Sequence, residues 1–130
     1  MKRHGVLNAP LSAAIARLGH RHLVMVTDCG MPLPYGHPVP IVDLALVAGF
    51  PSFTVVLDAL LDEIAVEGSV AATEARGSRV EDWLRQRQLD PDWVPHEQLK
   101  ALLPEVSLVV RTGEATPFAN VALRCGVTFA

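Results

Sequence analysis

The sequence has few cysteines, few aromatic residues and no long apolar run. Two cysteines in 130 residues do not make a disulfide framework, so both thiols are expected to be reduced. No apolar run approaches the ~20 residues of a membrane span. The basic residues at the start are not followed by the apolar segment of a signal peptide. These absences predict a cytoplasmic protein that has no membrane partner.

Clustered positive charge is also missing. The net charge is −3, and the basic residues are scattered, whereas a phosphate-binding surface needs them gathered. The nearest thing to a cluster is interleaved with acidic side chains, which is typical of a solvated helix face. Its arginines are Arg76, Arg79, Arg85 and Arg87. The sequence therefore predicts no nucleic-acid partner.

Several catalytic and cofactor motifs do not occur. The chain has no Cys-x-x-Cys pair and no His-Glu-x-x-His, so no metal site is predicted. It has no Gly-x-Gly-x-x-Gly fingerprint and no nucleophile elbow. Cys29 follows Asp28, and a neighbouring carboxylate makes a thiol less acidic, not more. The chemistry is therefore expected to need no cofactor and no covalent intermediate.

Half of the residues are apolar, mostly aliphatic, and helical and extended patterns alternate along the chain. Helices are predicted over 8–18, 53–63, 96–103 and part of 74–88, with Asn8 or Ala9 as the first cap and Ser52 as the second. Strands are predicted over 22–27, 41–47, 64–72, 93–94, 106–111, 121–123 and 127–129. This order predicts a single α/β domain over residues 1–130, with three layers (α/β/α) and a mostly parallel sheet.

The segment from Arg17 to Pro34 carries the first candidate site. Gly19 ends a helix, His20 follows it, and an apolar strand leads to Asp28. At ~3.3 Å per extended residue, His20 and Asp28 are on the order of 25 Å apart. One chain brings them together only if the turn at Gly19 folds back. Otherwise a neighbouring subunit must supply one of them.

Histidine is the side chain whose charge changes nearest neutral pH, and the chain has five. Most are expected to be surface residues. His20 differs because it precedes the apolar strand, and His96 because it opens a helix. Near the carboxyl end, the segments 111–114 and 116–120 are rich in hydrogen-bonding groups. They are either a simple turn or a rim for a polyhydroxy ligand, with Asn120 both donating and accepting.

Eight ordered motifs make the chain resemble the D-ribose pyranase / L-fucose mutarotase family. They are G-V-L-N at 5–8, L-G-H at 18–20, D-x-G-x-P-x-P at 28–34, I-V-D-L at 41–44, P-S-F at 51–53, H-E-Q at 96–98, R-T-G-E at 111–114 and P-x-A-N at 117–120. The match runs from end to end, and only residues 77–94 look unlike the family.

The resemblance implies an isomerase that interconverts β-pyranose and β-furanose forms of free D-ribose, without a cofactor. It implies that His20 is the acid/base residue, and that Asp28, His96 and the turn Phe118-Ala119-Asn120 bind the sugar. Asp28 would also support a protonated His20, while His96 and Asn120 orient the sugar. The family forms rings, commonly decamers of two pentamers, with sites shared between subunits.

Two features distinguish this chain within the family. The fucose branch usually has a tyrosine-containing segment where this chain has His96, so the ribose branch is favoured. Phe118 stands where the family typically has tyrosine, which removes a hydroxyl from the expected sugar site. The open alternatives are a mutarotase for another sugar such as L-fucose, a non-catalytic sugar-binding ring and a purely structural oligomer.

Overall fold

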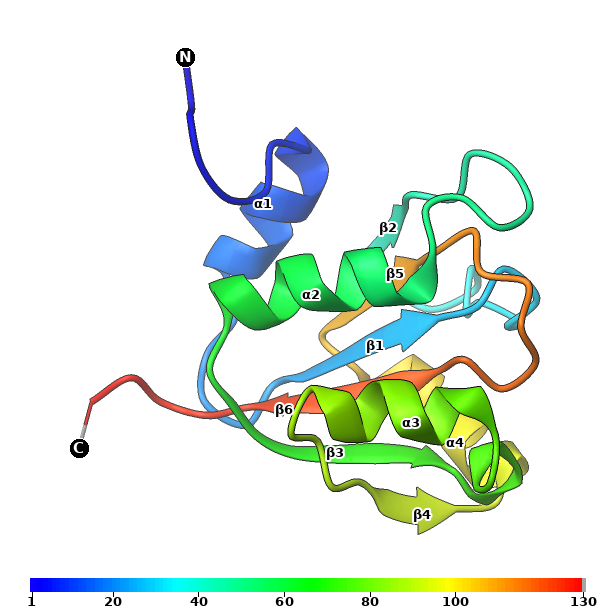
Figure 1. The fold of residues 1–130 in the computed structure, drawn as a ribbon. Helices are drawn as coiled ribbons and strands as arrows, with labels where there is room; N and C mark the ends of the chain where they lie inside the picture. The colour runs from blue at the N-terminus through cyan, green and yellow to red at the C-terminus, as the bar shows by residue number, and fades with distance from the viewer. Residues whose placement is uncertain (130) are drawn as a thin grey trace.

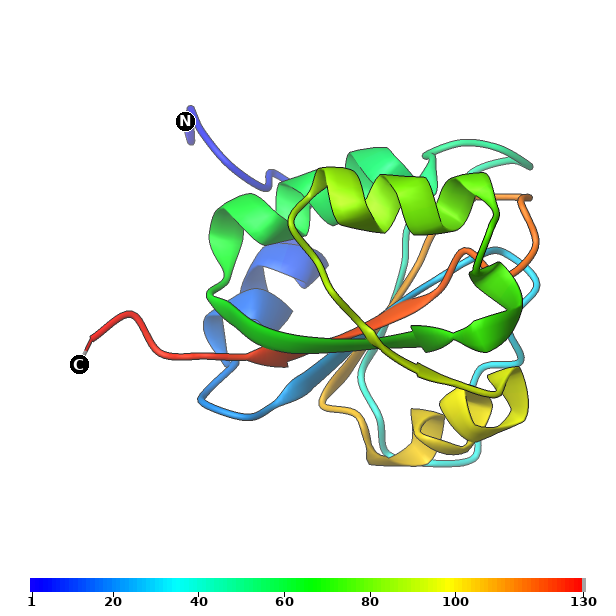
Figure 2. The ribbon, with the colours of Figure 1, turned by 60° about the horizontal axis from the view of Figure 1, so that its bottom comes forward.

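The computed structural model describes residues 1–129 and shows one six-stranded sheet between layers of helix (Figures 1 and 2). The strands are β1 (Leu23–Thr27), β2 (Ile41–Asp43), β3 (Val66–Ala72), β4 (Asp92–Val94), β5 (Leu108–Arg111) and β6 (Val121–Cys125). The helices are α1 (Ala9–Ala16), α2 (Phe53–Glu63), α3 (Arg79–Gln86) and α4 (His96–Ala101), with 3-10 turns η1 (Thr73–Ala75) and η2 (Leu103–Glu105). The predicted α/β class is confirmed.

The sheet is mixed, and most of its strands point the same way. Its order is β2-β5-β1-β6-β3-β4, with parallel pairing of β2 to β5, β5 to β1 and β3 to β4. Strand β6 lies antiparallel between β1 and β3. Five strands therefore end at one edge of the sheet, where β6 begins. We call this edge the carboxyl edge. It lies at the right in Figure 1.

The two faces of the sheet are covered unequally. Successive strand residues point to opposite faces, so Val24 and Val26 pack with α1, α2 and α3 while Met25 packs with α4 and η2. Figure 2 shows α2 and α3 above the sheet and α4 below it. Helix α2 begins because the Ser52 side chain accepts the N–H of Val55. It then buries Phe53, Val56, Leu57 and Leu60 against the sheet.

Several predicted element boundaries are wrong. The strand predicted over 41–47 ends at Asp43, whose side chain accepts the N–H of Ala45 and turns the chain away. The segment 127–129 is exposed and is not a strand, since β6 ends at Cys125. The first helix ends at Ala16, and of its two predicted caps the structure selects Asn8, whose side chain accepts the N–H of Leu11. None of the helices among residues 1–129 is long and apolar enough to cross a membrane.

Candidate functional site

Asp28 and Asn120 are joined at the carboxyl edge. Asp28 follows β1 and Asn120 precedes β6, and the pairing of Val26 with Val121 brings the two together. The Asp28 N–H donates to Asn120 Oδ1 at 2.8 Å, and Asn120 Nδ2 donates to Asp28 Oδ2 at 3.1 Å. Asp28 Oδ1 accepts the N–H of Gly30 at 2.9 Å. Asn120 is fully buried, so this pair is a fixed part of the fold.

His96 and Phe118 lie at the same edge. His96 begins α4 directly beyond β4, and its N–H donates to both carboxylate oxygens of Glu74 at 3.0 and 3.1 Å. Its ring meets Phe118 edge-on, with centroids 5.1 Å apart and planes at 80°. Phe118 has φ +63°, and Ala119 beside it is fully buried. The buried His96 Nδ1 has no hydrogen-bond partner within residues 1–129.

Two charged side chains, Arg111 and Glu114, form hydrogen bonds that connect the loops of the carboxyl edge. Arg111 pairs with Asp43 at 3.0 Å and donates to the carbonyl of Cys29, which fixes the chain after Asp28. Glu114 accepts from the N–H of Phe53 and from the Thr116 hydroxyl. Burial opposes the charged form of Glu114, but these donors outweigh it, so the pKa of Glu114 is lowered.

His20 lies at the opposite end of β1. It sits in a turn with Arg21 at φ +73°, where the Arg21 N–H donates to the carbonyl of Cys125 at 2.8 Å. His20 Nε2 and Glu67 Oε2 are 3.0 Å apart, and the two side chains are 48% and 37% exposed. This pair is close to the amino end of β1, well away from the carboxyl edge.

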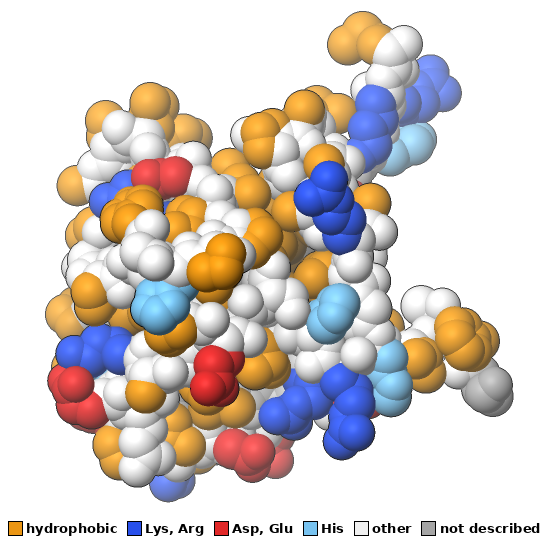
Figure 3. Space-filling view, turned by 180° about the vertical axis from the view of Figure 1, so that it is seen from behind, with side chains coloured by type: hydrophobic (Ala, Val, Ile, Leu, Met, Phe, Trp, Pro, Cys, Tyr) orange, Lys and Arg blue, Asp and Glu red, His pale blue; other side chains and the backbone are white. Residues whose placement is uncertain are grey.

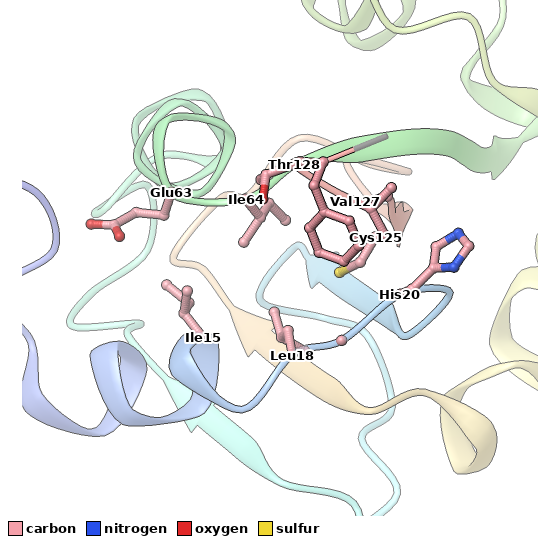
Figure 4. A pocket seen from close by; sticks show the side chains of 12 residues that line it. Ile15, Leu18, His20, Glu63, Ile64, Cys125, Val127 and Thr128 are labelled. Carbon is pink, nitrogen blue, oxygen red and sulfur yellow. The ribbon is translucent and has the colours of Figure 1, made fainter.

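A pocket of about 360 Å³ adjoins His20. It lies between the end of α1, the end of α2 and the segment after β6, and its lining includes Leu18, Ile64, Cys125 and Val127. Figure 4 shows His20 and Glu63 at opposite sides of it. Burial raises the pKa of the Cys125 thiol, with a further contribution from the negative charge of Glu67. None of the carboxyl-edge residues lines this pocket.

The residues selected from the sequence therefore fall into two groups. One chain brings Asp28 to Asn120 and His96 to Phe118, all at the carboxyl edge, but leaves His20 at the other end of β1. The carboxylate that meets His20 within one chain is Glu67 rather than Asp28. Sequence reasoning missed Glu67 and Glu74, although Glu67 is a charged residue inside an otherwise weakly polar strand. In the part of the chain described, no group of three His, Cys, Asp or Glu side chains could hold a metal ion.

Comparison with known proteins identifies the family of the chain. The model of the RbsD / FucU transport protein family matches residues 1–128. The chain belongs to this family. D-ribose pyranases of Cutibacterium acnes and Streptomyces avermitilis are each 53% identical to it, over 99% of this chain and the whole of each relative. The resemblance found in the eight motifs is thereby confirmed.

Solved structures of family members share the fold. Bacillus subtilis RbsD complexed with D-ribose matches with a TM-score of 0.90 and 38% identity, over 99% of this chain and 100% of that one. The fucose mutarotase of Streptococcus pneumoniae in complex with L-fucose matches with a TM-score of 0.82 and 17% identity, over 98% and 100%. The second likeness establishes the fold alone. In sequence, the chain lies nearer to the ribose-bound RbsD than to this fucose mutarotase.

Proposed function

We propose that this chain interconverts the β-pyranose and β-furanose forms of free D-ribose. The observation that carries the proposal is full-length identity of 53% to proteins called D-ribose pyranase. The carboxyl edge supports it, because the carboxylate of Asp28 and the buried His96 Nδ1 suit the hydroxyls of a sugar. The 38% identity to the ribose-bound RbsD also supports it.

The reaction breaks one C–O bond at C1 and forms another. A base takes the proton of the anomeric hydroxyl, the bond from C1 to the ring oxygen breaks, and that oxygen takes up a proton. The C4 hydroxyl of the resulting aldehyde then adds to C1 and loses its proton, while the aldehyde oxygen gains one. The sum is an isomerisation without oxidation, so proton transfer is the only chemistry required. A group that titrates near the working pH is best suited to it.

We assign the proton transfers to His20, as general base toward the anomeric hydroxyl and general acid toward the ring oxygen, and the sugar contacts to the carboxyl edge. Asp28 holds hydroxyls, and His96 and Asn120 orient the sugar, with Phe118 and Ala119 forming the adjoining turn. Fixed donors and acceptors keep the reacting atoms in place and so lower the entropic part of the barrier. The assignment of Asp28 as the support of a protonated His20 requires that the two residues come from different copies.

We therefore propose that neighbouring copies share each site, in a ring assembly of the decameric kind that the family resemblance implies. The separation of His20 from Asp28 within one chain supports this, since neither end holds the full set. An apolar groove of about 500 Å³ supports it as well, because its lining includes the exposed side chains of Leu7, Leu46 and Phe50. Figure 3 shows hydrophobic side chains gathered on the loop between β2 and α2.

The first experiment measures ribose ring exchange by magnetisation-transfer NMR. The wild type should accelerate pyranose–furanose exchange, and His20→Asn should lose about 10²–10⁴-fold of that acceleration, the usual contribution of an acid/base group. Full activity of His20→Asn would remove the role assigned to His20. Sugar binding without any acceleration by the wild type would favour the non-catalytic binding protein. Running L-fucose in parallel separates the two sugars.

Mixing two inactive variants tests the shared site. Each shared site takes His20 from one copy and Asp28 from its neighbour. The His20→Asn variant lacks the first part of the site and the Asp28→Asn variant lacks the second. Random co-assembly of equal amounts therefore gives about a quarter of sites in which both residues are native. Activity should return on unfolding and refolding the two together, and not from either alone. Persistent inactivity of a mixture that has co-assembled would show that each site is built from one copy.

Cytoplasmic location stays a prediction, which cell fractionation tests.

A further inference from the structure

We propose that Glu67 is the positioning residue of His20, holding its imidazole in the tautomer that carries hydrogen on Nε2. Nδ1 is then the nitrogen that exchanges a proton with the sugar. The reaction in this inference is the one given under the proposed function. The contact between the two residues is observed, since His20 Nε2 lies 3.0 Å from Glu67 Oε2.

The sheet breaks its register at Glu67. Val66 pairs with Cys125 and Gly68 with Arg124, so two steps along β3 correspond to one step along β6. Glu67 is the extra residue of this β-bulge. A bulge redirects the side chain it carries, and bulges often occur beside functional sites. Without the bulge, the alternation of a regular strand would set the direction of the Glu67 side chain.

A glycine makes room for the redirected chain. A Cβ on Gly126 would lie 3.3 Å from the Cβ of Glu67, which is tighter than ordinary contact. The Gly126 N–H also donates to the carbonyl of Ala65 at 2.8 Å, so the segment after β6 closes directly over the bulge. A larger residue at Gly126 would push against Glu67.

The same strand end holds the His20 turn. The Arg21 N–H donates to the Cys125 carbonyl, and the Cys125 N–H donates to the His22 carbonyl, each at 2.8 Å. Cys125 is also the partner of Val66 across the sheet. The backbone beside His20 and the backbone beside Glu67 are therefore both paired with Cys125, which keeps the two residues next to each other.

Folding energy does not account for this arrangement. Both side chains are more than one-third exposed, and exposed ion pairs add little to stability. The other ionisable groups at the turn and pocket are Arg21, His22, Glu63 and Cys125. His22 Nδ1 accepts the Gly19 N–H, while Glu63 accepts the N–H of Val6. Within residues 1–129, Glu67 makes no other side-chain hydrogen bond or ion pair.

The chemistry follows from the hydrogen bond. A carboxylate accepts and cannot donate, so neutral His20 must place its hydrogen on Nε2 and leave the Nδ1 lone pair free. When Nδ1 takes the proton of the anomeric hydroxyl, the same carboxylate stabilises the imidazolium. When Nδ1 returns a proton to the ring oxygen, the original tautomer is restored. A carboxylate that orients a catalytic histidine acts in this way.

A double-variant cycle with Glu67→Gln tests the inference. Glu67→Gln should lower kcat about 10–100-fold, as outer partners of a functional histidine do, with KM changed less than about 2-fold. In the His20→Asn background the same change should have almost no effect, since Glu67 acts through His20. Asp58→Asn is the matched control, because Asp58 is also an exposed carboxylate paired with a nitrogen, that of Arg87. It should leave kcat unchanged.

The tautomer is read directly by ¹⁵N NMR of the imidazole. Wild-type His20 should carry its hydrogen on Nε2, and Glu67→Gln should populate the other tautomer, with the melting temperature changed by less than about 2 °C. Equal slowing by Glu67→Gln in both backgrounds, or an unchanged tautomer, would overturn the inference. The tautomer readout needs no activity, so it distinguishes failure of this inference from failure of ribose isomerisation by the wild type.

Discussion

At the carboxyl end of β1, Asp28 shares two hydrogen bonds with a fully buried Asn120, whereas at the amino end a half-exposed His20 has one, to Glu67. The carboxyl end is also bound by Arg111 and Glu114, whose bonds join three loops. The amino end is held mainly by backbone hydrogen bonds of Cys125 and Gly126. The fold therefore preorganises the groups assigned to sugar binding and leaves the proton-transfer group at the surface.

This difference suits a site completed by a second copy. A binding surface must hold its donors and acceptors in place before the sugar arrives, which burial within one chain achieves. A proton-transfer group that meets the sugar across an interface must instead project from its own chain. Exposure of His20 is then a requirement, and the bulge at Glu67 supplies orientation that burial does not. Three substitutions, in order of expected effect, sharpen the contrast between the two ends.

Asn120→Ala should have the largest effect, because it leaves Asp28 without two hydrogen bonds at a buried position. We expect the free energy of unfolding to fall by about 1–3 kcal/mol in urea titrations, and ribose KM to rise at least 10-fold. Ser78→Ala is the matched control, since it removes the side-chain cap of α3 at a cost of about 1 kcal/mol. If both changes affected KM alike, the carboxyl edge would not be the sugar site.

Glu114→Gln should make the carboxyl end less sensitive to acid. The folded-state pKa of Glu114 is lowered, so its contribution to stability is complete above the unfolded value near 4.3 and is lost as pH falls through the folded value. The stability gap between wild type and Glu114→Gln, from urea titrations at several pH values, should therefore be constant from pH 7 to about 5 and shrink below.

Glu105→Gln is the control for Glu114→Gln, because it removes one exposed charge from η2 and no side-chain hydrogen bond within residues 1–129. The free energy of unfolding of Glu105→Gln should stay close to that of the wild type at every pH. A Glu114→Gln gap that widened toward low pH would contradict the expected sign and would mean that the donors around Glu114 do not hold its charged form.

The carboxyl end was largely predictable from the sequence, and the amino end was not. Asp28 follows an apolar strand, Asn120 precedes another, and both belong to ordered motifs, so local pattern identified them. The position before the same strand also drew attention to His20, and the resemblance implied its acid/base role. Which carboxylate meets His20 depended on a register shift between β3 and β6, two strands far apart in the sequence. The pattern within β3 alone does not show that a bulge forms against β6.

The wrongly predicted strand boundaries have a related cause. The apolar run after Ile41 resembles a buried strand up to Val47, but sheet pairing with β5 ends at Asp43 and Arg111. A strand is as long as its partner permits, and the partner is set by the whole topology. The same holds for 127–129, which has the residues of a strand but pairs with no strand among residues 1–129. Helix caps are local, and accordingly Ser52 was predicted correctly and Asn8 was one of the two residues predicted for the first cap.

Phe118→Tyr should have the smallest effect and the opposite sign. It restores the hydroxyl typical of the family beside His96, and one added hydrogen bond of about 0.5–1.5 kcal/mol should lower ribose KM about 2–10-fold. We expect kcat to stay within 2-fold, because Phe118 lies at the binding end and not with His20. Phe118→Leu removes the ring that meets His96 and should raise KM instead. An unchanged KM for Phe118→Tyr would show that the sugar offers this hydroxyl no partner, and that the carboxyl end binds ribose through Asp28, His96 and Asn120 alone.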